Sequence, residues 1–120
     1  MVQRKSRVAV LAALLALALP GGCHRPTRDP ATLGAIKAEA RMLMRAYPVA
    51  ANLPRARWPH TIASLEPEFV TIDPDGVYIT TRPYFDGGWG YFVPRNAQNL
   101  PEPAERFEEA GQGVYWWHPY

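Results

Sequence analysis

The fold is decided by residues 69–81, which read FVTIDPDGVYITT. Two runs rich in β-branched and aromatic residues, 69–72 and 77–81, flank the segment Asp73-Pro-Asp-Gly76. Runs of this kind favour strands, and the Asp, Pro and Gly residues between them favour a tight reversal of the chain. The stretch therefore predicts a β-hairpin.

Further strand patterns follow this hairpin. Residues 89–93 read WGYFV and end at a proline, which predicts a third strand. Residues 106–109 and 114–118 are joined through GQG at 111–113, and this pattern predicts a closing hairpin.

Helical signals precede the hairpin. Asp29 and Pro30 suit the start of a helix, because Asp caps free N–H groups and Pro is tolerated in the first turn. Apolar side chains then recur at helical spacing at Leu33, Ile36, Ala40, Leu43, Met44 and Tyr47. Residues 58–65 add one or two helical turns. Together these patterns predict an α+β domain over residues 31–120, with one N-terminal helix packed on an antiparallel β-meander of four to five strands.

The aromatic residues of this sheet suggest a binding surface. Neighbours in a strand, such as Trp116 and Trp117, point to opposite faces, and one helix covers only one face. Unless loops or a partner cover the second face, it exposes aromatic rings, which suit peptide or sugar partners. The alternative is that the rings simply fill the core of a small domain. The candidate partner-binding residues are Tyr78, Trp89, Tyr91, Phe92, Trp116 and Trp117.

No arrangement of residues predicts a catalytic, metal or cofactor site. His60 and Ser64 are four residues apart, but no nucleophile motif surrounds the serine. The acid pairs Glu66/Glu68 and Asp73/Asp75 each flank a proline, where carboxylates commonly cap turns. The Asp-x-Asp-Gly sequence lacks the Glu that a calcium loop needs at its twelfth position.

A row of cations lies along the predicted long helix. Lys37, Arg41 and Arg45 recur every four residues, away from the apolar stripe. Such a row could contact an anionic surface, but a solvated helix face is the favoured interpretation. The sequence predicts no nucleic-acid partner.

The first residues have the pattern of an export signal. Arg4, Lys5 and Arg7 precede twelve apolar residues, 8–19, which are too few to span a bilayer as a helix. Residues 1–22 are therefore predicted to be a signal peptide. Without its cations the chain carries ten basic and eleven acidic side chains, so the overall basicity does not predict an anionic partner.

The end of this segment resembles the lipobox of bacterial lipoproteins. It reads LPGGC at 19–23, with Pro20 where that family usually has Leu. The resemblance implies cleavage before Cys23 and acylation of Cys23, followed by a tether over residues 23–30. A lone free thiol would be a liability in an oxidising compartment, and a lipid removes it. The alternative is ordinary signal-peptide cleavage that leaves Cys23 as a free thiol.

These observations predict a lipid-anchored bacterial envelope protein. By the lipoprotein resemblance, His24 rather than Asp after the cysteine implies the outer membrane, facing the periplasm. From Trp58 to Val93 the domain resembles small uncharacterised bacterial proteins, a similarity that implies no activity. We expect a non-enzymatic binding or structural module whose partner is another envelope protein or cell-wall glycan. The alternatives are a small hydrolase that uses Glu or Asp with His60, and an inhibitor or immunity-type protein.

Overall fold

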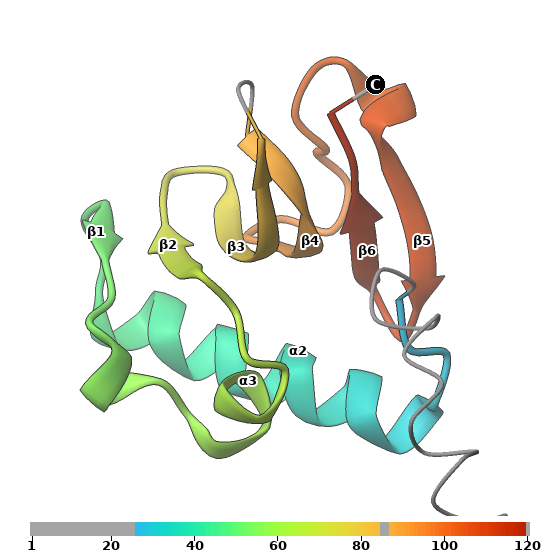
Figure 1. Cartoon of the computed structure of the whole chain (residues 1–120). Coiled ribbons are helices and arrows are strands. Elements are labelled where there is room, and N and C mark those ends of the chain that lie inside the picture. The colour runs from blue at the N-terminus through green and yellow to red at the C-terminus, as the bar shows by residue number, and fades with distance from the viewer. Residues whose placement is uncertain (1–25, 85–86, 120) are drawn as a thin grey trace, which may run out of the picture.

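A six-stranded sheet lies over one long helix in the part of the chain that the computed structural model describes, residues 26–84 and 87–119 (Figure 1). The strands are β1 (Ala51–Asn52), β2 (Phe69–Ile72), β3 (Gly76–Tyr84), β4 (Gly87–Pro94), β5 (Phe107–Gly111) and β6 (Val114–Trp117). The helical segments are α2 (Pro30–Ala46), η2 (Arg55–Arg57), α3 (His60–Ser64) and η3 (Ala104–Arg106). The α+β class predicted from the sequence is confirmed. The predicted signal peptide and Cys23 lie outside the described residues.

The start of α2 lies where the sequence predicts it. The Asp29 carboxylate accepts hydrogen bonds from the Thr32 backbone N–H at 3.0 Å and from its hydroxyl at 2.6 Å. These two bonds hold the pKa of Asp29 below its usual value, because they favour the charged carboxylate. At the other end, the Tyr47 N–H donates to the Leu43 carbonyl at 2.8 Å before Pro48 interrupts the helix.

The helix also positions α3, which lies alongside α2 below the sheet in Figure 1. The Glu39 carboxylate accepts hydrogen bonds from the N–H groups of Thr61 at 3.0 Å and Ile62 at 2.9 Å. The first N–H groups of any helix have no carbonyl in a preceding turn to bond to, so a carboxylate from the neighbouring helix satisfies them. Ile62 is fully buried and attaches α3 to the hydrophobic core.

The sheet is antiparallel throughout, in the order β1-β2-β3-β4-β6-β5. It has six strands rather than four or five because Ala51 and Asn52 pair with β2. A two-residue strand has no sequence pattern of its own, and the Leu53 N–H extends its pairing by donating to the Val70 carbonyl at 2.9 Å. The sheet also departs from a simple meander, since β6 lies between β4 and β5.

The hairpin predicted at residues 69–81 forms from β2 and β3. One carboxylate oxygen of Asp73 accepts from the N–H groups of Asp75 at 2.8 Å and Gly76 at 3.2 Å, closing the turn. Gly76 has a φ of +156°, and a Cβ there would collide with the Val93 carbonyl of β4. Glycine is therefore required at position 76, where the turn packs against β4.

The connection from β4 to β5, residues 95–106, has to pass β6. It starts where the Arg95 N–H donates to the Asp75 carbonyl at 2.7 Å, and ends where the Arg106 carbonyl accepts from the His118 N–H at 3.0 Å. Figure 1 shows it running from one end of the sheet to the other. The sequence pattern does not predict this crossing.

The main core lies between α2, α3 and one face of the sheet. Its members are buried apolar side chains from both helices, from the segment after β1 and from strands β2 to β6: Leu33, Ile36, Ala40, Leu43, Met44, Leu53, Ile62, Val70, Ile72, Val77, Ile79, Tyr91, Val93, Ala110, Val114 and Trp116. Burial of such side chains contributes roughly 1.5–3 kcal/mol each and is the main source of stability. The helical stripe predicted from the sequence therefore packs on the inward positions of the strands.

Candidate functional site

Two of the six predicted partner-binding residues belong to the main core. Tyr91 and Trp116 pair across β4 and β6, with ring centroids 5.2 Å apart in an edge-to-face arrangement. They are 4% and 7% exposed, so neither ring offers a binding surface. Burial raises the pKa of Tyr91, whose hydroxyl oxygen accepts a hydrogen bond from the Thr27 N–H at 2.8 Å.

Two more candidates lie on the opposite face and are also buried. Phe92 is 0% exposed and Trp117 8%. Phe92 contacts Tyr78 with centroids 4.6 Å apart and Phe107 at 5.1 Å, while Tyr78 meets Trp117 at 5.2 Å. The second face is thus a second aromatic layer rather than a bare surface.

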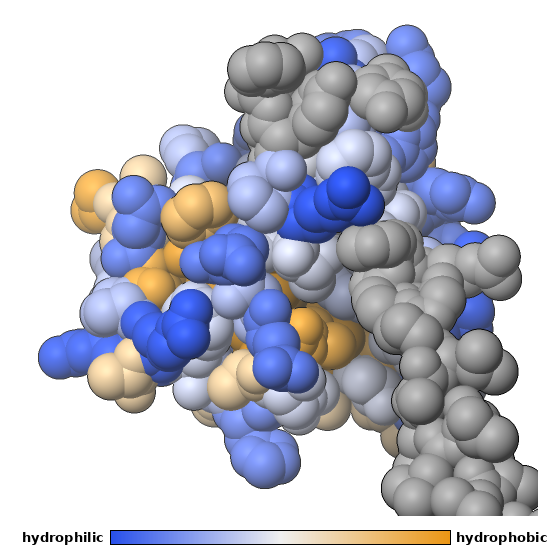
Figure 2. All heavy atoms as spheres, viewed as in Figure 1, coloured by the Kyte–Doolittle hydropathy of each residue, from blue (hydrophilic) through white to orange (hydrophobic). Residues whose placement is uncertain are grey.

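The last two candidates, Tyr78 and Trp89, are partly exposed but lie on opposite faces. Tyr78 belongs to the second layer, and Trp89 packs against the main core under the Arg82 guanidinium, 5.3 Å from the ring centroid. The six residues therefore form no shared exposed patch, and the predicted aromatic binding face is wrong. On the side shown in Figure 2, hydrophobic residues are visible only as separate areas among polar ones.

A different aromatic residue lines an open hollow. Trp58 follows η2, and its indole N–H donates to the Leu53 carbonyl at 3.0 Å, which fixes the ring. The Arg55 guanidinium lies over this ring, 5.1 Å from the centroid. The hollow has a volume of about 360 Å³ and is lined by Arg55, Trp58, Ala63, Glu66, Pro67 and Glu68.

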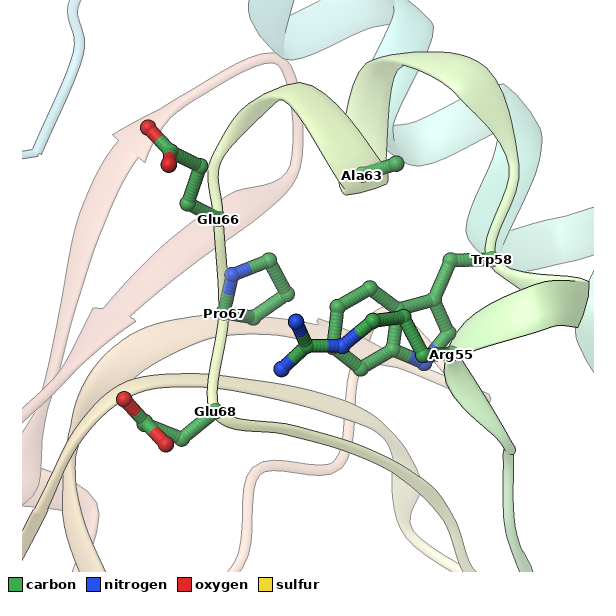
Figure 3. A pocket seen from close by; sticks show the side chains of 6 residues that line it. All are labelled: Arg55, Trp58, Ala63, Glu66, Pro67 and Glu68. Atoms are coloured by element: carbon green, nitrogen blue, oxygen red, sulfur yellow. The ribbon is translucent and has the colours of Figure 1, made fainter.

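Each wall of this hollow is held by the fold. Glu66 ends α3 with a φ of 53°, which turns the chain toward Pro67, a buried residue. The Glu68 N–H then donates to the Thr80 carbonyl at 2.7 Å, joining this wall to β3. Figure 3 shows Pro67 facing Arg55 and Trp58 across the open space. A cation stacked on an aromatic ring, facing a rigid proline, suits the binding of a small side chain or a short peptide segment.

The residues of the hydrolase alternative are not assembled in this hollow. Figure 3 shows the Glu66 and Glu68 carboxylates pointing away from the space between Arg55 and Pro67. His60 is not among its lining residues. The Ser64 hydroxyl donates to the Thr61 carbonyl at 2.5 Å, so it is occupied within its own helix. The geometry therefore gives no acid, base and nucleophile in contact.

The described residues also bear on metal sites and membrane spans. Within 26–84 and 87–119, no three His, Cys, Asp or Glu side chains lie close enough together to hold a metal ion. In the same ranges, no helix combines the length and the apolar character needed to cross a bilayer.

The predicted tether is bound to the domain over its second half. Besides the bond from Thr27 to Tyr91, Arg28 Nη1 donates to the Glu109 carbonyl at 3.2 Å and to the Ala110 carbonyl at 3.5 Å. Arg28 Nη2 also lies 3.9 Å from the Glu108 carboxylate, in an exposed pair of small energetic weight. The chain is thus fixed to β4 and β5 from residue 27 onward.

The signal for the hollow was present in the sequence as Trp58, an aromatic residue in a connector that contains three prolines.

Comparison with known proteins adds no assignment, because no protein-family model, no curated protein and no solved structure matches the chain.

Proposed function

We propose that this chain is a lipid-anchored bacterial envelope protein whose domain binds a segment of another envelope protein without catalysing a reaction. The observation that carries the binding proposal is the Arg55–Trp58 pair at the open hollow. Trp and Arg are the residue types that most often dominate binding energy at protein interfaces. Here they are held in one arrangement before any partner arrives, which lowers the entropic cost of binding.

The chemistry of the hollow favours a peptide over a sugar as its occupant. Sugar rings stack on an open aromatic face, and the Arg55 guanidinium already covers one face of Trp58. Arg55 supplies a cation inside the hollow, and Glu66 and Glu68 supply anions at its rim. Charges of both signs around an aromatic floor match a peptide segment that carries polar side chains.

The anchoring proposal rests on the lipobox resemblance at residues 19–23. The bound tether supports this proposal, because only residues 24–26 separate Cys23 from Thr27, which is hydrogen-bonded to Tyr91. Three residues span at most about 11 Å when extended. A lipid on Cys23 would therefore hold the β5 side of the domain close to the bilayer.

The binding proposal is tested by photo-crosslinking from the hollow. Ala63 is exposed and lines the hollow, so a photo-reactive amino acid there should leave the fold intact. We expect a discrete crosslinked product in whole cells, whose partner mass spectrometry identifies as an envelope protein. The matched control is the same amino acid at Ala97, which is exposed on the β4–β5 connection.

One substitution sharpens this test. Arg55→Ala removes an exposed side chain and should reduce the crosslink from position 63 at least about fivefold, if it contributes roughly 1 kcal/mol to binding. A crosslink to glycan alone, the same products from positions 63 and 97, or no product from position 63 would contradict the proposal.

The anchoring proposal has a separate test. We expect radiolabelled palmitate to enter the wild-type chain and not Cys23→Ala, because Cys23 provides the only thiol. By the lipoprotein resemblance, His24→Asp should retain the label but move the protein to the inner membrane. Label that is absent from the wild type, or equal in Cys23→Ala, would refute acylation at this residue.

A further inference from the structure

Three arginine side chains from distant parts of the chain line one cleft. Arg41 and Arg45 lie on the same face of α2, and Arg95 follows directly after β4. Together with Met44 they line a space of about 340 Å³. The row of cations predicted along the helix is thus joined by a third guanidinium from another element, which the sequence pattern does not indicate.

Arg95 is held in place by the turn of the first hairpin. Its backbone N–H donates to the Asp75 carbonyl at 2.7 Å, and its guanidinium Nη2 donates to the Asp73 carbonyl at 3.1 Å. A guanidinium has five N–H donors, so this bond leaves most of them available. Arg95 therefore presents its charge from a fixed position.

The row itself divides at Lys37. The Lys37 ammonium lies beside Gly113, since a Cβ built on that glycine would approach Nζ to 3.0 Å. Lys37 therefore points to the β5–β6 turn, while Arg41 and Arg45 line the cleft.

The three guanidinium groups are not neutralised by ion pairs. In the described ranges an ion pair joins Arg28 and Glu108, and none involves the cleft arginines. The Asp73 carboxylate, on the turn that Arg95 contacts, already accepts two backbone N–H bonds. No carboxylate lines the cleft itself. Three like charges around one space repel one another, and a bound anion would relieve that repulsion.

We propose that this cleft binds a phosphoryl group. A phosphoryl group offers several acceptor oxygens and more than one negative charge, and guanidinium forks match its geometry. A single carboxylate is satisfied by one fork, so three converging arginines fit the larger anion better. The site shares no residue with the hollow at Trp58, and the inference does not depend on the proposed function.

The test is a titration of the full-length protein with inorganic phosphate, followed by the amide NMR shifts of residues 41, 45 and 95. The protein is held in zwitterionic detergent, and sodium chloride of matched ionic strength provides the reference. We expect saturable shifts with phosphate and none with chloride. Arg41→Gln/Arg45→Gln should lower the apparent association constant at least about tenfold, because charged hydrogen bonds are lost. Both side chains are exposed and form no described bond, so this variant should fold.

A second arm distinguishes the source of the phosphoryl group. The same amides are followed in nanodiscs of phosphatidylcholine with and without one fifth phosphatidylglycerol. Shifts with free phosphate support a soluble ligand, and shifts only with phosphatidylglycerol support a lipid headgroup. Arg55→Ala, which tests the other hollow, should bind as the wild type does. The proposal is overturned if neither arm gives saturable shifts, or if the double variant binds like the wild type.

Discussion

Tyr78 is the residue at which burial and charge act together most clearly. It is partly buried in the second aromatic layer, against Phe92 and Trp117. Burial raises the pKa of Tyr78 above its usual value, and the nearby charges of Asp73 and Asp75 raise it further. The folded domain therefore keeps this phenol neutral at a pH at which the unfolded chain begins to lose the proton.

This shift predicts a loss of stability at high pH. The contribution of Tyr78 is fully present below about pH 10, where the phenol is neutral in both states. Above that pH the unfolded chain binds fewer protons, so the free energy of unfolding falls by up to about 1.4 kcal/mol per pH unit for this residue. Urea unfolding between about pH 9 and about pH 11 should show the decline, and Tyr78→Phe should make it shallower.

Two comparisons define the outcome. Asp75→Asn removes one of the charges that raise the pKa of Tyr78, so it should also reduce the decline, although by less than Tyr78→Phe. Burial raises the pKa of Tyr91 as well, so some decline should remain in every variant. An identical decline in wild type and Tyr78→Phe would mean that the phenol ionises equally in both states.

Secondary-structure elements differ in whether they tolerate a side chain in place of glycine, and two glycines show this difference. Gly34 lies in α2 with nothing within 4 Å of the place of a Cβ. Gly90 lies in β4 between two neighbouring strands, where a Cβ would collide with the Ile79 carbonyl of β3. Alanine therefore fits the helix position and not the strand position.

The pair predicts stability changes of opposite sign. Gly34→Ala should raise the free energy of unfolding by about 0.5–1 kcal/mol, because alanine favours a helix and restricts the unfolded chain. Gly90→Ala should lower it by about 1–3 kcal/mol, because the strands must move apart. Chemical denaturation followed by tryptophan fluorescence measures both. A neutral Gly90→Ala would show that the sheet adjusts at no cost.

At the same scale, the elements themselves follow from local sequence signals. Asp29 and Pro30 predict the start of α2, and residues 73–76 predict the first hairpin, because these residues act on their own neighbours. The order of the sheet does not follow in this way. Whether β5 lies inside or outside β6 depends on contacts between distant strands, and no local pattern encodes it.

At the scale of the whole molecule, the dependence on contacts between distant segments also explains which parts of the candidate sites the sequence could predict. Alternation along the strands correctly separates Trp116 from Trp117, but it does not reveal that both rings are buried. The hollow at Trp58 combines η2, α3 and the start of β2, and the arginine cleft combines α2 with the end of β4. Both sites depend on tertiary packing, so the sequence contains their residues but does not show that these residues lie close together.

The two edge strands of the sheet have a consequence when copies of the protein are crowded together. An anchored protein diffuses in two dimensions, where neighbouring copies meet at high local concentration, and an open strand edge then invites pairing between molecules. One edge here is β1, only two residues long, and at the other the Arg28 guanidinium already occupies carbonyls of β5. Neither edge offers a long unpaired strand, so dense packing at a membrane surface would not seed aggregation through the sheet.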